Sequence, residues 1–333
     1  MGAPFPETHD PATQRLIDES QRDFPLVAEP FAAVGARLGL EEADVRRRIA
    51  GLIAAGAATR LGAVVRPHAA GASTLAALAA PPERIEAIAR IVGGFAGVNH
   101  NYEREGAWSL WFVVTGAERR EVAATLAAIE GATGLAVLDL PLERAYHIDL
   151  GFDLFGPPRA RRAPRPLLRA ADEADRRLLG AIERGLPLVS RPYADVAARL
   201  GVPETEVTGR LSAMIADGVI VRLGLVVRHA FFGYRANAMA VWDVADEHVD
   251  EIGKSFAREG RVTLCYRRPR RPPNWRFNLF TMVHATTRED ALGVVERLAA
   301  QAQGAVRERD VLFSLRCFKQ RGARFSAPKE AAE

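Results

Sequence analysis

The chain has 333 residues, 48% hydrophobic and 26% charged, which is the composition of an ordinary globular protein with material for two or more domains. These proportions exclude disordered and collagen-like chains. The two cysteines, Cys265 and Cys317, exclude a disulfide framework and lack metal-ligand spacing. No run of 18 apolar residues occurs, and the first residues lack a basic segment followed by an apolar one. The sequence therefore predicts no membrane span and no secretory signal, and we expect a reducing, cytoplasmic location.

The net charge is modest, because 45 basic residues stand against 41 acidic ones and give +4. Five arginines fall within Arg159–Arg169, a segment without an acidic residue, so the rest of the chain is about neutral. Bulk charge therefore gives little support for a nucleic-acid partner. The positions of individual arginines are more informative than their sum.

The chain is an internal duplication. When the sequence is shifted by 162 residues, segment 24–71 aligns with segment 186–233 without gaps, and 23 of 48 positions are identical. The Pro/Arg-rich stretch between the copies is typical of an exposed, semi-extended linker.

Each copy begins with a pattern of three short helices. In the first copy we expect helices at 11–22, at 30–38 and from about 41 to Gly56, the second of them ending at Gly39. A strand at 58–66 follows, and the set predicts a helix-turn-helix with a small wing. The matching elements of the second copy are expected at 172–185, 192–200, 203–217 and 220–228.

The rest of each copy alternates strand and helix in the order βαββαβ, which is typical of a ferredoxin-like plait. The first copy is expected to have strands at 73–80, 97–105, 107–116 and 134–148, with helices at 82–94 and 118–131. The second is expected to have strands at 235–244, 261–268, 274–285 and 305–319, with helices at 246–260 and 287–301. The predicted fold class is therefore α+β, a tandem duplication of a winged helix-turn-helix plus a ferredoxin-like βαββαβ domain.

These patterns divide the chain into consecutive segments. The predicted boundaries are 1–66 for the first helix-turn-helix, 67–155 for the first ferredoxin-like domain, 156–170 for the linker, 171–228 for the second helix-turn-helix, 229–325 for the second ferredoxin-like domain and 326–333 for a disordered tail.

A helix-turn-helix followed by a βαββαβ domain resembles the leucine-responsive (Lrp/AsnC) regulators, which implies a third helix that enters the major groove of DNA. The first copy offers Arg46, Arg47 and Arg48 there, whereas the second, PETEVTGRLSAMIADG, has one arginine and several acids. Phosphate contacts supply much of DNA affinity, so two such unequal helices make DNA an unlikely partner. Two unequal halves suit a built-in heterodimer instead.

Titratable side chains gather on two strands of each plait. In the strand VNHNYER, alternation puts His100, Tyr102 and Arg104 on one face. The second copy matches the tyrosine and the arginine with Tyr266 and Arg268, but it has Leu264 in place of the histidine. The histidine therefore belongs to the first copy alone.

The last strands align as LPLERAYH on LFSLRCFK, so Arg144 matches Arg316 and His147 matches Lys319. His284 aligns with Thr115. A lone strand histidine is more often structural than catalytic. However, no Ser-His-Asp order, Gly-rich nucleotide loop or metal cluster is present. The imidazole and guanidinium groups that remain suit a polyanionic substrate and proton transfer.

The distinctive motifs of the first copy are RLGAVVRPH, NHNYERE, WSLWFVV and LPLERAYHIDLGFDL. Those of the second copy are RLGLVVRH, CYRRP and NWRFNLFTMVH. With these motifs the chain resembles the siroheme decarboxylases, which are built on the Lrp/AsnC architecture. The resemblance runs from about Ala12 to Arg324 and is to the fused form, in which two subunit types are joined. It implies a carboxy-lyase that removes the carboxyls of two acetate side chains of siroheme to give 12,18-didecarboxysiroheme. The pathway would be that of heme d1, or of heme, and the fused form favours heme d1. No cofactor is implied, because the iron is carried by the substrate.

On this resemblance we hypothesise that His100 and His147 are the proton donors. Alternation from Arg144 puts His147 on the opposite face, so a bulge or the strand end must reorient one of the two; either histidine could instead ligate the siroheme iron. Candidate carboxylate clamps in the first copy are Arg60, Arg66, Arg104 and Arg144, with Tyr102 orienting His100. A second binding site could comprise Arg222, Arg228, Tyr266, Arg267, Arg268, His284 and Lys319. No metal site of the protein itself is expected.

The expected partners are siroheme and didecarboxysiroheme. The two halves are expected to form an internal pseudo-heterodimer, with further homo-oligomerisation left open and no membrane partner. Two alternatives stay open beside the enzyme: an Lrp-type transcription regulator that responds to heme, and a tetrapyrrole carrier without chemistry.

Overall fold

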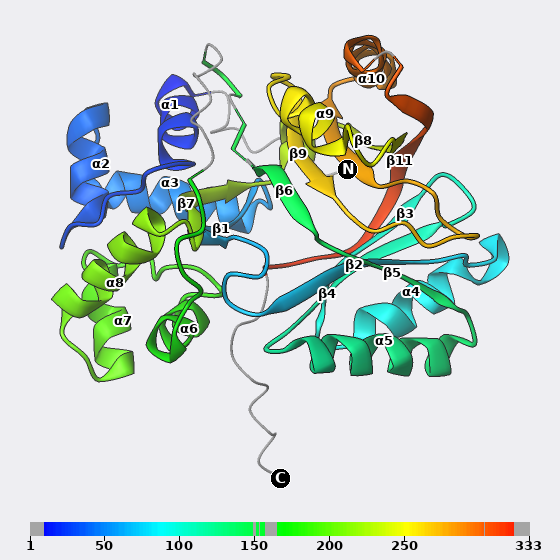
Figure 1. Cartoon of the computed structure of the whole chain (residues 1–333). Coiled ribbons are helices and arrows are strands. Elements are labelled where there is room, and N and C mark those ends of the chain that lie inside the picture. Colours follow the sequence, from blue (N-terminus) through cyan, green and yellow to red (C-terminus); the bar gives the residue numbers. More distant parts are fainter. Residues whose placement is uncertain (1–9, 149–150, 153, 157–164, 303, 323–333) are drawn as a thin grey trace. The chain divides into compact units, whose positions relative to one another are not determined.

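The computed structural model describes residues 10–148, 151–152, 154–156, 165–302 and 304–322 (Figure 1). The chain forms two compact units, and neither is a continuous stretch of sequence. Met1–Ala70 with Leu150–Gly233 form what we call the helical unit, and Gly71–Asp149 with Tyr234–Glu333 form the sheet unit. Most of the predicted linker and the whole predicted tail, 326–333, lie outside the described residues. No described helix is long and apolar enough to cross a membrane.

The helical unit holds two sets of three helices. They are α1 (Pro11–Ser20), α2 (Pro30–Leu38) and α3 (Glu42–Ala54) in the first copy, and α6 (Glu173–Ala181), α7 (Pro192–Leu200) and α8 (Glu204–Ala216) in the second. The second helix of each set ends at a glycine in the left-handed conformation, Gly39 and Gly201, both with φ 71°. An L-residue rarely adopts this φ, so the predicted ends are found where glycine permits them. The first helices are shorter than predicted at their C-terminal ends.

The wing strands predicted in the two copies pair with each other. Strand β1 (Ala58–Val65) lies antiparallel to β7 (Ile220–Val227) of the other copy. Gly62 stands opposite Gly224 at the middle of this two-stranded sheet. The short 3-10 helix η3 (His229–Phe232) follows β7. Each strand thus finds its hydrogen-bonding partner in the duplicate.

The sheet unit contains both plaits. The first consists of β2 (Ala72–Leu78), η2 (Pro82–Arg84), α4 (Ile85–Gly94), β3 (Val98–Arg104), β4 (Leu110–Gly116), α5 (Arg119–Thr133), β5 (Val137–Pro141) and β6 (Arg144–Ile148). The second consists of β8 (Ala236–Val244), α9 (Val249–Phe256), β9 (Val262–Arg267), β10 (Leu279–Ala285), α10 (Arg288–Gln301) and β11 (Val306–Gln320). The βαββαβ order is present in both copies.

The last strand of each plait joins the two plaits into one sheet of order β5-β2-β4-β3-β11-β8-β10-β9-β6. The first part of β11 pairs with β8 of its own copy, and its last part pairs with β3 of the other copy. In the first copy β5 pairs with β2, and β6 pairs with β9 of the second copy. The single strand predicted at 134–148 is therefore two strands, because each part pairs with a different plait.

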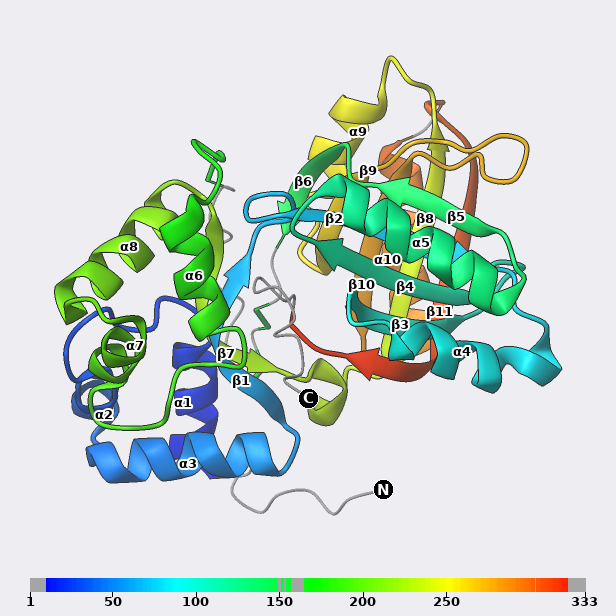
Figure 2. The same cartoon turned by 90° about the horizontal axis from the view of Figure 1, so that it is seen from below.

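Three hydrophobic clusters fill the sheet unit. One lies between the first plait and its helices α4 and α5, and another between the second plait and α9 and α10 (Figures 1 and 2). The third combines residues of both copies, including Trp111 of β4 and Phe280 of β10, with Trp275 beside both. The part of the sheet in each plait therefore has one face on its helices and one face turned to the other plait. We call the second of these the inner face.

Candidate functional site

Three side chains of β3 lie in a row on the inner face. The rings of His100 and Tyr102 are stacked, with centroids 6.3 Å apart and planes within 12°, and the guanidinium carbon of Arg104 is 5.7 Å from the Tyr102 centroid. Tyr102 stands opposite Trp111 of the inner cluster, whereas Asn101 faces the helices and donates to the carbonyl of Ala89 at 2.9 Å. Strand alternation thus brings the three predicted residues together.

Arg104 is a buried cation. It is 6% exposed, and its Nη1 donates to the carbonyl oxygen of Leu312 at 3.0 Å. Burial lowers its pKa from 12.5 to about 10, so it stays charged at neutral pH. Among the described residues it forms no ion pair with a carboxylate. A buried cation with only a carbonyl and an aromatic face beside it is suited to bind an anion.

The second copy repeats this row at the end of β9, with Tyr266 in the strand and Arg268 just after it. Arg268 lies 5.3 Å from the Tyr266 centroid and 5.8 Å from that of Phe280, and its Nη1 donates to the carbonyl of Leu140 at 2.6 Å. Burial lowers the pKa of Arg268 to about 10 as well. Leu264 stands where the first copy has His100. The two rows therefore share a tyrosine and an arginine, but one of them has no imidazole.

The strand beside the first row adds an exposed thiol. Cys317 of β11 stands opposite Tyr102 and is exposed. A buried cation, an imidazole, an aromatic ring and this thiol on neighbouring strands could bind a flat molecule with carboxylates at its rim.

His147 lies at the other junction between the copies. It is 6% exposed, and its backbone stands opposite Cys265 on β9 after a register shift that begins at Ala145. Arg144, predicted as a substrate clamp, instead forms an ion pair with Asp250 of α9, and the Tyr146 hydroxyl donates to the same carboxylate. This position argues against Arg144 as a carboxylate clamp, because an acid already holds it.

The two predicted proton donors are not on neighbouring strands. His100 is on β3, which pairs with β11, and His147 is on β6, which pairs with β9. Four strands stand between β3 and β6 in the described sheet order. Each histidine therefore belongs to its own junction between a strand of the first copy and a strand of the second.

The other predicted residues of the sheet unit have local partners. Lys319 donates from Nζ to the carbonyls of Gly93 and Phe95 at the end of α4, at 2.5 and 3.2 Å. His284 is 6% exposed, and its Nδ1 is 2.9 Å from the hydroxyl of Thr263. Arg267 pairs with Glu143 at 3.0 Å and lies 3.7 Å from Asp250.

Four predicted arginines lie in the helical unit, on or next to β1 and β7. Arg60, Arg66 and Arg222 each donate to backbone carbonyls of that unit, at 3.1, 2.8 and 2.7 Å respectively. Arg222 is 6% exposed, and burial lowers the pKa of Arg60. Arg228 is exposed. Three of these four cations thus contribute to the structure of the helical unit.

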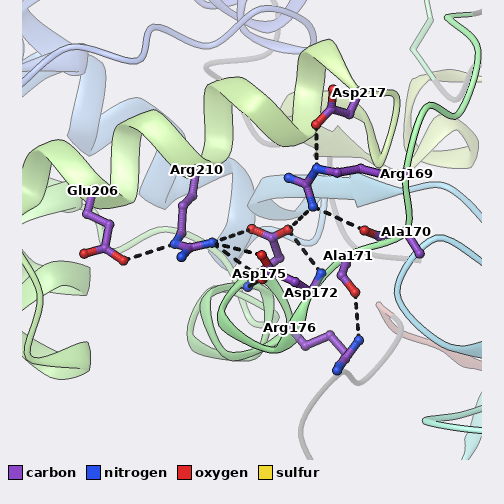
Figure 3. A network of polar contacts seen from close by, with 9 residues as sticks. All are labelled: Arg169, Ala170, Ala171, Asp172, Asp175, Arg176, Glu206, Arg210 and Asp217. Atoms are coloured by element: carbon purple, nitrogen blue, oxygen red, sulfur yellow. Dashed lines mark hydrogen bonds and ion pairs between the residues drawn. The ribbon is translucent and has the colours of Figure 1, made fainter.

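The arginine of helix α8 is held in an ion-pair network (Figure 3). The carboxylate of Asp175 is fully buried. It lies 3.3 Å from the guanidinium of Arg210 and 2.6 Å from that of Arg169, a residue at the end of the linker. Arg210 also pairs with Glu206 at 3.1 Å and with Asp172, the N-cap of α6, at 3.4 Å. The described end of the linker is therefore exposed but held to α6 and α8 through Arg169.

The first copy repeats the pattern on α3. Arg48 pairs with Asp44 and with Asp10, the N-cap of α1. Arg46 and Arg47 pair with acids of the same helix, Glu42 and Asp44. All three arginines that the sequence offered to DNA phosphates are thus engaged with carboxylates.

Sequence reasoning did not find Tyr146, Asp250 or Gly253, which meet beside His147. A weak signal was available, because an acid in the first turn of a helix and a tyrosine next to a histidine are both visible in the sequence. Their contact depends on the pairing of β6 with the other copy. The described residues contain no group of three His, Cys, Asp or Glu that could hold a metal ion.

Comparisons with known proteins agree with this architecture. The family model "AsnC-like ligand binding domain" matches residues 70–147 and 231–319, and "Siroheme decarboxylase NirDL-like HTH domain" matches 13–57 and 175–220. The Siroheme decarboxylase NirDL subunit of Paracoccus denitrificans (strain Pd 1222) is 44% identical over 317 residues, covering 95% of this chain and 98% of that protein. Two crystal structures of a siroheme decarboxylase NirDL are similar over 95% of this chain and 94% of theirs. One has a TM-score of 0.70 at 26% identity, and the other, in co-complex with an iron-uroporphyrin III analogue, has 0.66 at 27%.

Proposed function

Since this chain belongs to the siroheme decarboxylase NirDL family, we propose that it is a carboxy-lyase that acts on siroheme. The reaction proposed is removal of the carboxyl groups of two acetate side chains, which gives 12,18-didecarboxysiroheme for heme d1 formation. Neither carboxyl loss changes the redox state of the substrate, so no redox cofactor is needed, and the iron arrives with the substrate.

The observation that carries this proposal is the row of His100, Tyr102 and Arg104 on the inner face of β3. Siroheme is a flat macrocycle with carboxylates around its rim. No carboxylate among the described residues pairs with Arg104. A carboxylate of the substrate could do so and accept two hydrogen bonds from the guanidinium group. Cys317, opposite Tyr102, would contact the ring.

The chemistry requires a proton donor, which we propose is His100. Protonation of a pyrrole carbon creates an electron sink. The bond to the carboxylate then breaks, CO₂ leaves, and its electron pair forms an exocyclic double bond to the ring. A proton added to the exocyclic carbon and loss of the ring proton complete the methyl group, so each turnover consumes one proton. Substrate carboxylates raise the pKa of a nearby imidazole and keep it protonated near neutral pH.

We propose that the two halves work as a pseudo-heterodimer with His100 at one junction and His147 at the other. Each junction combines a strand of the first copy with a strand of the second, β3 with β11 and β6 with β9. The second copy has Leu264 and Lys319 in place of the two histidines, which supports a binding and supporting role for it. Arg104 and Arg268 are the clamps that the geometry favours, ahead of Arg144.

The experiment is anaerobic incubation of the purified protein with siroheme, followed by mass analysis of the tetrapyrrole. Loss of one and then two carboxyl groups is the expected result. His100→Ala and His147→Ala should each slow turnover while siroheme binding is largely retained, and His248→Ala, which removes an exposed histidine, serves as the matched control. Binding with unchanged mass would support the carrier and overturn the enzyme. Full activity in both histidine variants would show that the proton donor lies elsewhere.

The regulator is disfavoured by the ion pairs of α3 and α8. A reading helix needs free cations for phosphates, and the arginines of both helices are held by carboxylates. Salt-resistant, sequence-selective retardation of DNA in a gel would reverse this conclusion.

A further inference from the structure

Tyr146, the residue before His147, has a closely fitted site on helix α9. Its hydroxyl donates to the carboxylate of Asp250 in the first turn of the helix. Its ring lies against Gly253, where a Cβ would come within 2.3 Å of a ring carbon. Asp250 and Gly253 are three residues apart and therefore lie on one face of α9. The ring can lie this close to the helix because residue 253 has no side chain.

The strand that carries Tyr146 and His147 is held by further contacts with the second copy. Arg144 pairs with the same Asp250, and Glu143, just before the strand, pairs with Arg267 at 3.0 Å. The register shift between Ala145 and His147 places Tyr146 at the irregularity of the β6–β9 ladder. The conformation of the strand at His147 is thus set where Tyr146 contacts the helix.

The duplicated junction provides an internal comparison. There Lys319 replaces His147, Phe318 replaces Tyr146, and Ala89 stands at the place of Gly253. Phe318 has no hydroxyl and is 36% exposed, whereas Tyr146 is 8% exposed. The ion pair of the arginine is kept, because Arg316 pairs with Glu86 as Arg144 pairs with Asp250. The fitted contact is therefore found beside the histidine and not beside the lysine.

We propose that Tyr146, Asp250 and Gly253 are positioning residues that fix the orientation of His147 for proton transfer. The first copy supplies the histidine and the tyrosine, and the second copy supplies the helix against which they are held. This inference rests on the proposed role of His147 as a proton donor. It gives the second half of the chain a defined part in the reaction although that half has neither histidine.

The test compares two substitutions that disturb the contact in different ways. Tyr146→Phe removes the hydroxyl and reproduces the residue found in the other copy. Gly253→Ala places a methyl group against the ring. Gly209→Ala is the matched control, since Gly209 is also in a helix but has nothing within 4 Å of an added Cβ. His147→Ala provides the reference for complete loss of the imidazole.

The expected result is a loss of kcat of roughly tenfold in Tyr146→Phe and more in Gly253→Ala, because misplacing a reacting group by about 1 Å can cost about 100-fold. KM for siroheme should stay within about twofold. The pH profile of kcat should shift, and so should the His147 signal in spectra of protein with ¹⁵N-labelled histidine, identified by its absence in His147→Ala. Gly209→Ala should match the unaltered protein in all four readouts.

A purely structural role would lower the amount of folded protein but would leave kcat per folded molecule, the pH profile and the His147 signal unchanged, and that outcome overturns the inference. If Gly253→Ala does not fold, Tyr146→Phe decides alone. Full activity of His147→Ala would instead refute the proposed role of His147, whatever the other variants do. The two failures are therefore distinguishable.

Discussion

Replacement of Arg104 by methionine tests the proposed clamp most directly, because it should weaken siroheme binding and leave the stability of the protein nearly unchanged. Burial lowers the pKa of Arg104 from 12.5 to about 10. At about 1.4 kcal/mol per pKa unit, this difference corresponds to about 3 kcal/mol by which the buried cation destabilises the folded state. The folded pKa lies below the unfolded one, so the destabilisation is fully present at every pH below about 10.

Methionine is apolar and similar in length, so Arg104→Met removes this destabilisation. It also removes the hydrogen bond from the charged guanidinium to Leu312, worth about 1.5–3 kcal/mol, and the contact with Tyr102, worth roughly 0.5–1 kcal/mol. These losses offset the gain, so the free energy of unfolding should change by no more than about 1 kcal/mol. Loss of a charge-assisted hydrogen bond to a substrate carboxylate, about 1.5–3 kcal/mol, should weaken siroheme binding by roughly 10- to 100-fold.

The stability assay can be confined to the sheet unit, since all four tryptophans, Trp108, Trp111, Trp242 and Trp275, lie in it. Urea unfolding followed by tryptophan fluorescence therefore reports on this unit, and absorbance titration with siroheme gives the affinity. Arg316→Met is the control, because Arg316 is exposed and paired with acids, and it should change stability by no more than about 0.5 kcal/mol. A less stable Arg104→Met protein with unchanged siroheme affinity would refute the reasoning and make Arg104 a structural residue.

Three further predictions concern other parts of the chain. Siroheme should protect Cys317 from alkylation, because this exposed thiol stands opposite Tyr102. Burial raises the pKa of the Cys265 thiol, so Cys265 should not react with or without the ligand. Equal labelling of Cys317 in both conditions would place the substrate elsewhere. Arg210→Met should destabilise the helical unit by about 1–3 kcal/mol in unfolding followed by circular dichroism, since it takes one cation from a fully buried carboxylate; an unchanged midpoint would contradict this. Burial lowers the pKa of His229 to about 4, so the helical unit should lose stability as pH falls from about 6.5 to 4, where the unfolded chain binds the proton first. His229→Phe should remove that pH dependence in thermal unfolding, and a slope that persists would assign it to another group.

Much of the fold could be predicted because its signals are local. The helix ends at Gly39 and Gly201 follow from the φ that glycine permits, and the βαββαβ order follows from periodicity in each copy. The row of His100, Tyr102 and Arg104 follows from strand alternation. None of these inferences requires knowledge of which segments meet in space.

What the sequence left open concerns the pairing of segments that are distant along the chain. The wing strands were predicted without a partner, and β1 pairs with β7. The strand expected at 134–148 divides between two plaits. Arg144 and Arg66, predicted as substrate clamps, have distant partners that the sequence did not indicate: Asp250 holds the first, and backbone carbonyls accept from the second. In each case the partner is at least 59 residues away along the chain, where no local pattern can indicate it.

The sequence by itself determined the duplication, the type and order of the elements, the family and the residues that the two copies do not share. Those properties depend on local conformational preference and on residue identity, both of which can be read along the chain. Only the tertiary structure decided which arginines form ion pairs with carboxylates and which do not. It also placed His100 and His147 at two different junctions between the copies. It did so because hydrogen bonding of strand edges and burial depend on which segments of the two copies meet.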